Sequence, residues 1–145
     1  MNSANLYAPP KSKVDDVGTR LQPADIDSLP VSQKWKARFH IISAAGGPKL
    51  PRFKELAVGE RRKIGFNIPA FLFGPLYYLA KGMWRKAISL FVVCFAALTA
   101  VSVILELLGH GDIARAFRYA TGAVFAARAN IDFYKKMVLK ENGWW

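Results

Sequence analysis

The sequence contains only one cysteine and two histidines among its 145 residues. Cys94 lies in an apolar run, and a single thiol forms neither an intrachain disulfide nor a cysteine-based metal site, so we expect it to pack as a small apolar side chain. His40 and His110 have no cysteine, histidine or carboxylate at the spacing of a metal site. The sequence therefore predicts no metal site.

Catalytic motifs are missing as well. The chain has no glycine-rich loop of the phosphate-binding pattern and no G-x-S-x-G motif. Glu106 is the single carboxylate of the long apolar block, and one carboxylate does not make a proton relay. Residues 1–16 lack the apolar core of a secretory signal peptide, so internal segments are expected to direct any insertion into a membrane. We expect a protein that is not an enzyme and that binds no cofactor.

Positive charge is abundant, with 21 Lys and Arg against 10 Asp and Glu and a formal net charge of +11. Such an excess suits nucleic acid or an anionic membrane surface. The basic residues lie at the edges of apolar segments, as in membrane proteins, so we expect anionic lipid and not nucleic acid as a partner. The expected membrane-surface contacts are Arg61, Arg62, Lys63, Lys81, Trp84, Arg85 and Lys86, together with Trp35 and Phe39 from an earlier helix.

The polar part of the chain precedes the apolar block. Residues 1–31 carry four prolines among small and polar residues, which is typical of a flexible tail. Residues 32–63 are interpreted as a basic amphipathic helix followed by a connector. In that helix Trp35 and Phe39 share one face, and two alternatives stay open. Either this face enters the headgroup region of a membrane, or the helix packs on its neighbours.

Residues 64–145 are interpreted as a membrane domain. Segment 87–108 has one ionisable group, and as a helix it would reach about 33 Å, enough to cross a hydrocarbon core of about 30 Å. A turn then leads to a second transmembrane helix over 113–131, and 132–145 is a basic aromatic tail. In this hairpin Glu106 faces Arg115, so the two are expected to form an ion pair; alternatively both lie at the interface without touching.

The charges also orient the hairpin. The turn GHGD has no Lys or Arg, whereas both outer flanks have several. Because cytoplasmic flanks hold Lys and Arg, the turn is expected outside the cytoplasm and the N-terminal region inside it.

Segment 64–84 is apolar and aromatic but interrupted. Asn67 is a candidate helix cap, and Gly74-Pro75 predicts a bend because Pro75 removes a helical hydrogen bond. Short, bent and flanked by basic residues, the segment favours a re-entrant or interface-hugging pair of helices, with a tilted full crossing as the alternative. Four aromatic side chains are candidates for a lipid or quinone groove, or for an interface belt or core: Phe71, Phe73, Tyr77 and Tyr78.

The same segment resembles a known family. Asn67, the run AFLFGP at 70–75, the pair Tyr77-Tyr78 and the run GMWRK at 82–86 resemble the signature of small bacterial inner-membrane proteins grouped as domain-of-unknown-function family 2628. The opening NLYAPP is similar to the N-P-Y-A-P-P start of many short bacterial membrane proteins, with Leu6 in place of proline. The resemblance covers residues 66–108 well and the ends loosely. It implies a protein of the bacterial inner membrane and implies no activity. The predicted hairpin adds the expectation of a multi-pass protein.

The expected fold is therefore an all-α membrane protein: a transmembrane helical hairpin, a Gly-Pro-bent hydrophobic helix and a flexible, partly helical polar N-terminal region. The expected function is that of a non-enzymatic accessory or scaffold subunit, which binds another membrane protein or a second copy of itself. Two alternatives are an organiser that binds anionic lipid at the membrane surface, and a binder of a lipid or quinone-type ligand at the Gly-Pro bend.

Overall fold

The structure is a computed structural model that describes residues 23–116 and 119–145. All regular elements in these ranges are helices, and no strand is found among them, in agreement with the expected all-α class. The elements are α1 (Pro23–Asp27), α2 (Gln33–Ala44), the 3-10 helix η1 (Phe53–Glu55), α3 (Val58–Gly65), α4 (Ile68–Phe73), α5 (Pro75–Ala80), α6 (Trp84–Leu107), α7 (Gly111–Ala116) and α8 (Ala120–Met137).

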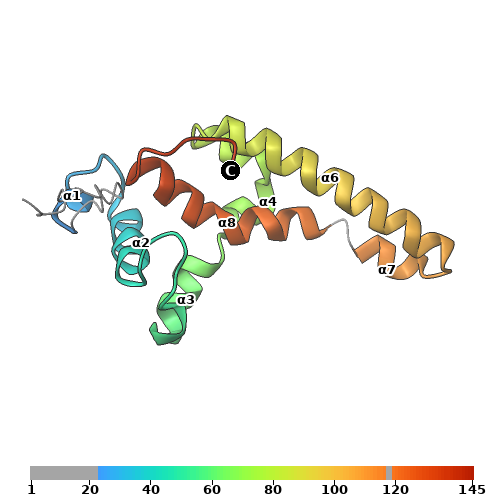
Figure 1. The fold of residues 1–145 in the computed structure, drawn as a ribbon, viewed down its shortest axis with the longest axis horizontal. Coiled ribbons are helices and arrows are strands. Elements are labelled where there is room, and N and C mark those ends of the chain that lie inside the picture. The colour runs from blue at the N-terminus through green and yellow to red at the C-terminus, as the bar shows by residue number, and fades with distance from the viewer. Residues whose placement is uncertain (1–22, 117–118) are drawn as a thin grey trace, which may run out of the picture.

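The helices form a packed base and a protruding arm (Figure 1). We call residues 23–94 and 120–138 the base, and residues 95–116 the arm. Every buried hydrophobic side chain of the described residues belongs to the base. The arm consists of the far part of α6 with α7 folded back along it, and none of the α6 side chains in the arm is buried. The hydrophobic core thus lies at one end of α6.

Helix α8 is the centre of the base, because α2, α3, α4 and α6 all pack on it. The ring of Phe133 lies 4.6 Å from that of Trp35, and the ring of Tyr134 lies 5.6 Å from that of Phe39. Trp35 and Phe39 are therefore core residues of an α2–α8 contact and not membrane-surface contacts. Of the two alternatives for this helix, packing on its neighbours is the correct one, since burial of two large aromatic rings stabilises the fold.

The polar N-terminal part is more ordered than expected. Residues 1–22 of the predicted tail lie outside the described residues, but Pro23–Asp27 forms α1, and Ile26 and Leu29 are buried in the core. The flexible-tail prediction is therefore wrong for residues 23–31. The connector up to residue 63 likewise contains η1 and most of α3, and α3 buries the side chain of Ile64.

The chain turns at Gly74, between α4 and α5. Gly74 has φ +47° and ψ −119°, a conformation that favours glycine, and Pro75 follows at the first position of α5, where its missing N–H is harmless. Asn67 caps α4, since its Oδ1 accepts a hydrogen bond of 3.2 Å from the Ala70 N–H, as predicted. Each of the two helices has six residues and so reaches only about 9 Å.

Close approach of α4 to α8 depends on Gly122. A Cβ atom at this position would lie 2.6 Å from the carbonyl oxygen of Phe71, which is closer than real Cβ contacts allow. Gly122 therefore permits close packing of α4 on α8 within the base.

The expected transmembrane hairpin is not confirmed. Helix α6 is long and apolar enough to cross a membrane, and within the described residues it is the single helix that meets this test. The helix expected over 113–131 corresponds to two elements, α7 and α8, on either side of the undescribed residues 117–118. Helix α8 also continues to Met137, into the predicted tail 132–145, and the side chains of Phe133 and Tyr134 in this part are buried in the core.

Candidate functional site

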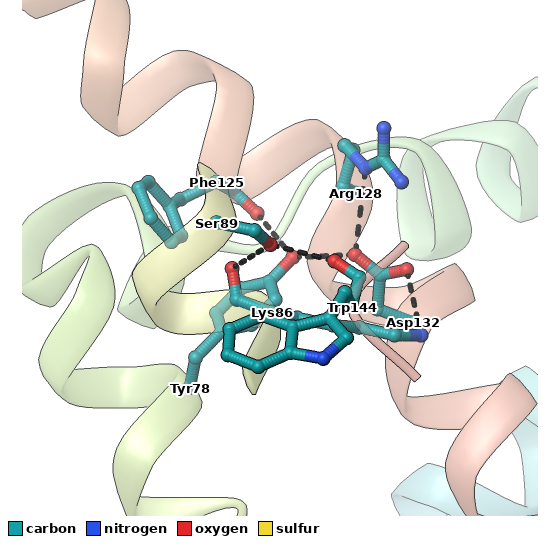
Figure 2. A network of polar contacts seen from close by, with 7 residues as sticks. All are labelled: Tyr78, Lys86, Ser89, Phe125, Arg128, Asp132 and Trp144. Atoms are coloured by element: carbon teal, nitrogen blue, oxygen red, sulfur yellow. Dashed lines mark hydrogen bonds and ion pairs between the residues drawn. The ribbon is translucent and has the colours of Figure 1, made fainter. Parts of the chain in front are cut away.

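A buried cluster of polar side chains joins α5, the start of α6 and α8 (Figure 2). Lys86 Nζ lies 3.2 Å from Asp132 Oδ1, and both side chains are almost completely buried. The Tyr78 hydroxyl donates a hydrogen bond of 3.0 Å to Asp132 Oδ2 and lies 3.4 Å from the Phe125 carbonyl oxygen. Three helices thus meet at one carboxylate.

Each group is positioned by a local feature of the chain. Pro75 starts α5, and its second turn carries Tyr78 toward α8. Lys86 lies in the first turn of α6, and Ala87 and Leu90 on the same side of that helix are buried as well. Because a buried ion pair must compensate the loss of hydration of both charges, the extra donors on Asp132 are essential to its stability.

Arg128 connects the cluster to the surface. It lies one turn before Asp132 on α8, with Nε 3.5 Å from Asp132 Oδ2 and a side chain that is 40% exposed. The carboxylate is therefore surrounded by one buried cation, one partly exposed cation and one hydroxyl. Burial, followed by the negative charge of Asp132, raises the pKa of the Tyr78 hydroxyl above its ordinary value, so Tyr78 acts as a hydrogen-bond donor.

A second buried cluster includes Asn130, two residues before Asp132 on α8, and holds the α3–α4 junction on α8. Asn67 Nδ2 donates to Asn130 Oδ1 at 3.0 Å, and Asn130 Nδ2 donates to the Ile64 carbonyl oxygen at 2.9 Å. The Asn67 N–H also donates to the Ala126 carbonyl oxygen at 3.1 Å. These bonds satisfy buried polar groups between helices, so they specify how α4 lies against α8.

The arrangement indicates a structural role. Asp132 is balanced by buried donors, and no group of three or more potential metal ligands occurs among the described residues. His40 lies 2.9 Å from Asp27 Oδ1, but this pair has no third ligand there. The cluster fixes the direction in which α6 leaves the base.

One acidic residue of the first cluster and one asparagine of the second were not predicted from the sequence. Asp132 is the single acidic residue between Asp112 and Glu141, and Asn130 lies two residues before it. The isolated acid within a basic segment was the available signal. Lys86 was expected at a membrane surface, but it is buried against Asp132, and that expectation is wrong.

The other expected surface residues lie in different environments. Arg62, Lys63, Trp84 and Arg85 are exposed, and Lys81 is half-buried. Arg61 is half-buried, and its guanidinium donates to the carbonyl oxygens of Leu56 and Lys54. The four exposed residues are accessible to a membrane surface, whereas the Arg61 side chain is held by hydrogen bonds to the segment just before α3.

The four aromatic groove candidates do not line one groove. Tyr78 is buried against Phe125, with ring centroids 5.0 Å apart, while Phe73 is 59% exposed. Phe71 and Tyr77 are half-buried, and Tyr77 accepts a hydrogen bond from Asn67. The expected pair of Glu106 and Arg115 cannot be placed, because the Arg115 side chain lies outside the described residues, and it stays a prediction.

Comparison with known proteins gives a family and no activity. The model of the family described as "Protein of unknown function (DUF2628)" matches residues 24–138. The "Uncharacterized protein YigF" of Escherichia coli (strain K12) is 30% identical over 123 residues, which cover 79% of this chain and 90% of that relative. The protein of the same name from Salmonella typhimurium is 28% identical over the same shares of the two chains. No solved structure is significantly similar to this chain.

Proposed function

The chain belongs to the DUF2628 family, whose function is unknown, and we propose that it is a non-enzymatic accessory protein of a bacterial inner membrane. In this proposal α6 crosses the bilayer from Trp84 onward, the part of the base that precedes α6 lies at the cytoplasmic surface, and the arm presents its side chains to lipid and to another membrane protein.

The observation that carries the proposal is the exposure of apolar side chains along α6. The helix has 24 residues, which corresponds to about 36 Å. Only 11% of the residues in its most apolar 18-residue stretch are buried within the chain. Exposure of these side chains to water would be unfavourable, by a free energy on the order of 10 kcal/mol for all of them together. The exposed large side chains of α6 are Trp84, Ile88, Phe91, Val92, Val93, Phe95, Val101, Val103, Ile104 and Leu107.

A second apolar surface lies beside the start of α6. Helices α4 and α5 expose Leu72, Phe73 and Leu76, each by more than half. Two helices of six residues do not reach across a hydrocarbon core of about 30 Å, so this surface fits shallow immersion. We infer that α4 and α5 lie at the cytoplasmic interface, with exposed Trp84 and Arg85 at headgroup level.

An accessory role fits the rigidity of the attachment. The buried Lys86–Asp132 pair holds the first turn of α6 on α8, so base and arm have a defined relative direction. A fixed direction of the arm relative to the base suits a protein that contacts one partner at the membrane surface and another within the bilayer. The alternative of a ligand at the Gly-Pro bend receives no support from the side chains there, whereas lipid binding does receive support from a different site, described below.

Cysteine accessibility in intact cells tests the membrane crossing. In a Cys94→Ala background, His110→Cys would place a thiol at the far end of α6, and Lys49→Cys would place one on an exposed loop of the base. We expect a membrane-impermeant thiol reagent to label position 110 in intact cells, and position 49 only after lysis. Equal protection of both positions in intact cells, with equal labelling after lysis, would show that α6 does not cross.

Photo-crosslinking tests the accessory role. A photoreactive residue in place of Val101 on the arm, compared with one in place of Lys49 on the base, should give a protein adduct of discrete mass from the membrane fraction. Adducts with lipid alone at position 101 would contradict the accessory role and favour the lipid-organising alternative.

A further inference from the structure

A pocket of about 430 Å³ lies between the segment that precedes α2, the end of α5 and the last turns of α8. Its lining includes Val31, Trp35, Lys81, Phe133, Lys136 and Met137. None of these residues belongs to the buried cluster around Asp132. The pocket, which we call the Lys81 pocket, is therefore a separate feature of the base.

Two lysine residues line this pocket. Lys136 Nζ donates a hydrogen bond to the Lys81 carbonyl oxygen, and the charge of Lys136 acts on the Lys81 ammonium group. Lys81 Nζ lies 4.8 Å from the ring centroid of Phe133 and 5.2 Å from that of Trp35. These aromatic faces hold the ammonium group in place through cation–π attraction, so it is positioned before any ligand arrives.

Among the residues that the structure describes, no carboxylate balances the positive charge at the pocket. The guanidinium of Arg38 lies 4.8 Å from the Trp35 ring centroid, so a third cation is close by. Burial, followed by the charges of Arg38 and Lys136, lowers the pKa of the Lys81 ammonium group. Within the described ranges no carboxylate pairs with any of these three cations. Like charges held together in this way attract an anion.

The position of the pocket favours a phosphate group as the anion. Lys81 is three residues before Trp84, where the apolar helix begins. If α6 crosses a bilayer, this level is that of the lipid phosphates. The pocket also combines its cations with apolar walls from Val31, Phe133 and Met137, which suits a phosphate attached to an organic group.

We propose that the Lys81 pocket binds a phosphate-bearing anion, with the ammonium groups of Lys81 and Lys136 as its ligands and Trp35 and Phe133 as its aromatic wall. This inference deepens the proposed function, since the phosphate is available either from an anionic lipid headgroup or from a soluble phosphate compound.

The test uses the full chain, purified in an uncharged detergent, and isothermal titration calorimetry with three probes. The probes are inorganic phosphate, short-chain phosphatidylglycerol and short-chain phosphatidylcholine. Saturable binding of phosphatidylglycerol alone would support the proposal with a lipid headgroup as the source. Saturable binding of inorganic phosphate as well would support it with a soluble source. Absence of saturable binding of every probe would overturn it.

Variants separate the pocket from general charge attraction. Lys81→Gln and Lys136→Gln each remove one ligand, and we expect about tenfold weaker binding because a charge-assisted hydrogen bond is lost. Lys135→Gln is the matched control: it removes the same charge from the neighbouring position of α8, which does not line this pocket. Binding within about twofold of the unmodified chain is expected there. Equal weakening by all three substitutions would overturn the proposal.

Two safeguards keep the test decisive. If Lys81→Gln disturbs folding, as judged by circular dichroism, Lys136→Gln decides the outcome, because among the described residues the Lys136 side chain donates one hydrogen bond, to the Lys81 carbonyl oxygen. The result is also distinguishable from failure of the proposed function. Phosphate binding without membrane crossing of α6 would contradict the proposed function alone, and crossing without phosphate binding would contradict the pocket alone.

Discussion

Replacement of Lys86 by methionine would leave the Asp132 carboxylate buried without its closest cation. The two side chains are 1% and 2% exposed, and Lys86 Nζ lies 3.2 Å from Asp132 Oδ1. Methionine has a similar length and no charge, so the main change is electrostatic. We expect a marked loss of stability, because an uncompensated buried charge is far more costly than the pair is favourable.

The magnitude follows from what remains around the carboxylate. Removal of one partner of a buried ion pair costs about 3–5 kcal/mol in general. Asp132 keeps the Tyr78 hydroxyl at 3.0 Å and the half-exposed Arg128 at 3.5 Å, which places the loss near the lower end, at about 3 kcal/mol. For a chain of this size that corresponds to a fall in Tm of roughly 10 °C.

Thermal unfolding in a mild detergent, followed by circular dichroism, measures this loss. Asp132→Asn should relieve the penalty, so the double variant Lys86→Met/Asp132→Asn should lose at least about 1 kcal/mol less than the sum of the single losses. Lys63→Met, on an exposed lysine of α3, is the matched control and should leave Tm almost unchanged. A Lys86→Met variant as stable as Lys63→Met would refute the structural role of the pair.

Three further predictions concern the base. Gly122→Ala should lower the free energy of unfolding by about 1–3 kcal/mol, because its Cβ would lie 2.6 Å from the Phe71 carbonyl oxygen. The control is Gly59→Ala in α3, where the space around the Cβ is open, and it should be neutral or stabilising in the same thermal assay. Above about pH 10, where an unfolded tyrosine ionises, the raised pKa of Tyr78 keeps its hydroxyl protonated in the folded chain, so stability should fall as pH rises. Tyr78→Phe should lose less stability between pH 8 and pH 11 than the unmodified chain does, and an equal loss would contradict this. Asn130→Ala should cost about 1–3 kcal/mol by leaving the Ile64 carbonyl without its donor, and should speed hydrogen exchange of the α4 amides; unchanged exchange would show that Asn130 does not hold α4.

Local signals in the sequence were sufficient for several features of the fold. The all-helical class, the apolar helix that became α6, the cap at Asn67 and the family all follow from residues close together in the chain. Helix periodicity, capping and proline geometry act over three or four residues, so such features are visible without tertiary structure. The boundaries of the folded part were less visible, as the buried side chains of Ile26 and Leu29 show.

The candidate site was not visible in the same way. Lys81, Arg85 and Lys86 look alike in the sequence as a basic flank before an apolar helix, yet Arg85 is exposed, Lys86 is buried in an ion pair and Lys81 lies over aromatic rings. One step along a helix rotates a side chain by about 100°, so neighbouring residues of one type meet different surroundings.

The sequence by itself determined the all-helical class, the bend of the chain at Gly74 and Pro75, and which helix is apolar enough to enter a membrane. Only the tertiary structure decided which charges are buried and which remain on the surface. Lys86 and its partner Asp132 are 46 residues apart, and the residues around Asp132 in the sequence do not indicate that the two form a pair. The physical reason is that secondary structure arises from neighbours along the chain, whereas the environment of a charge is set by whichever helices happen to pack around it.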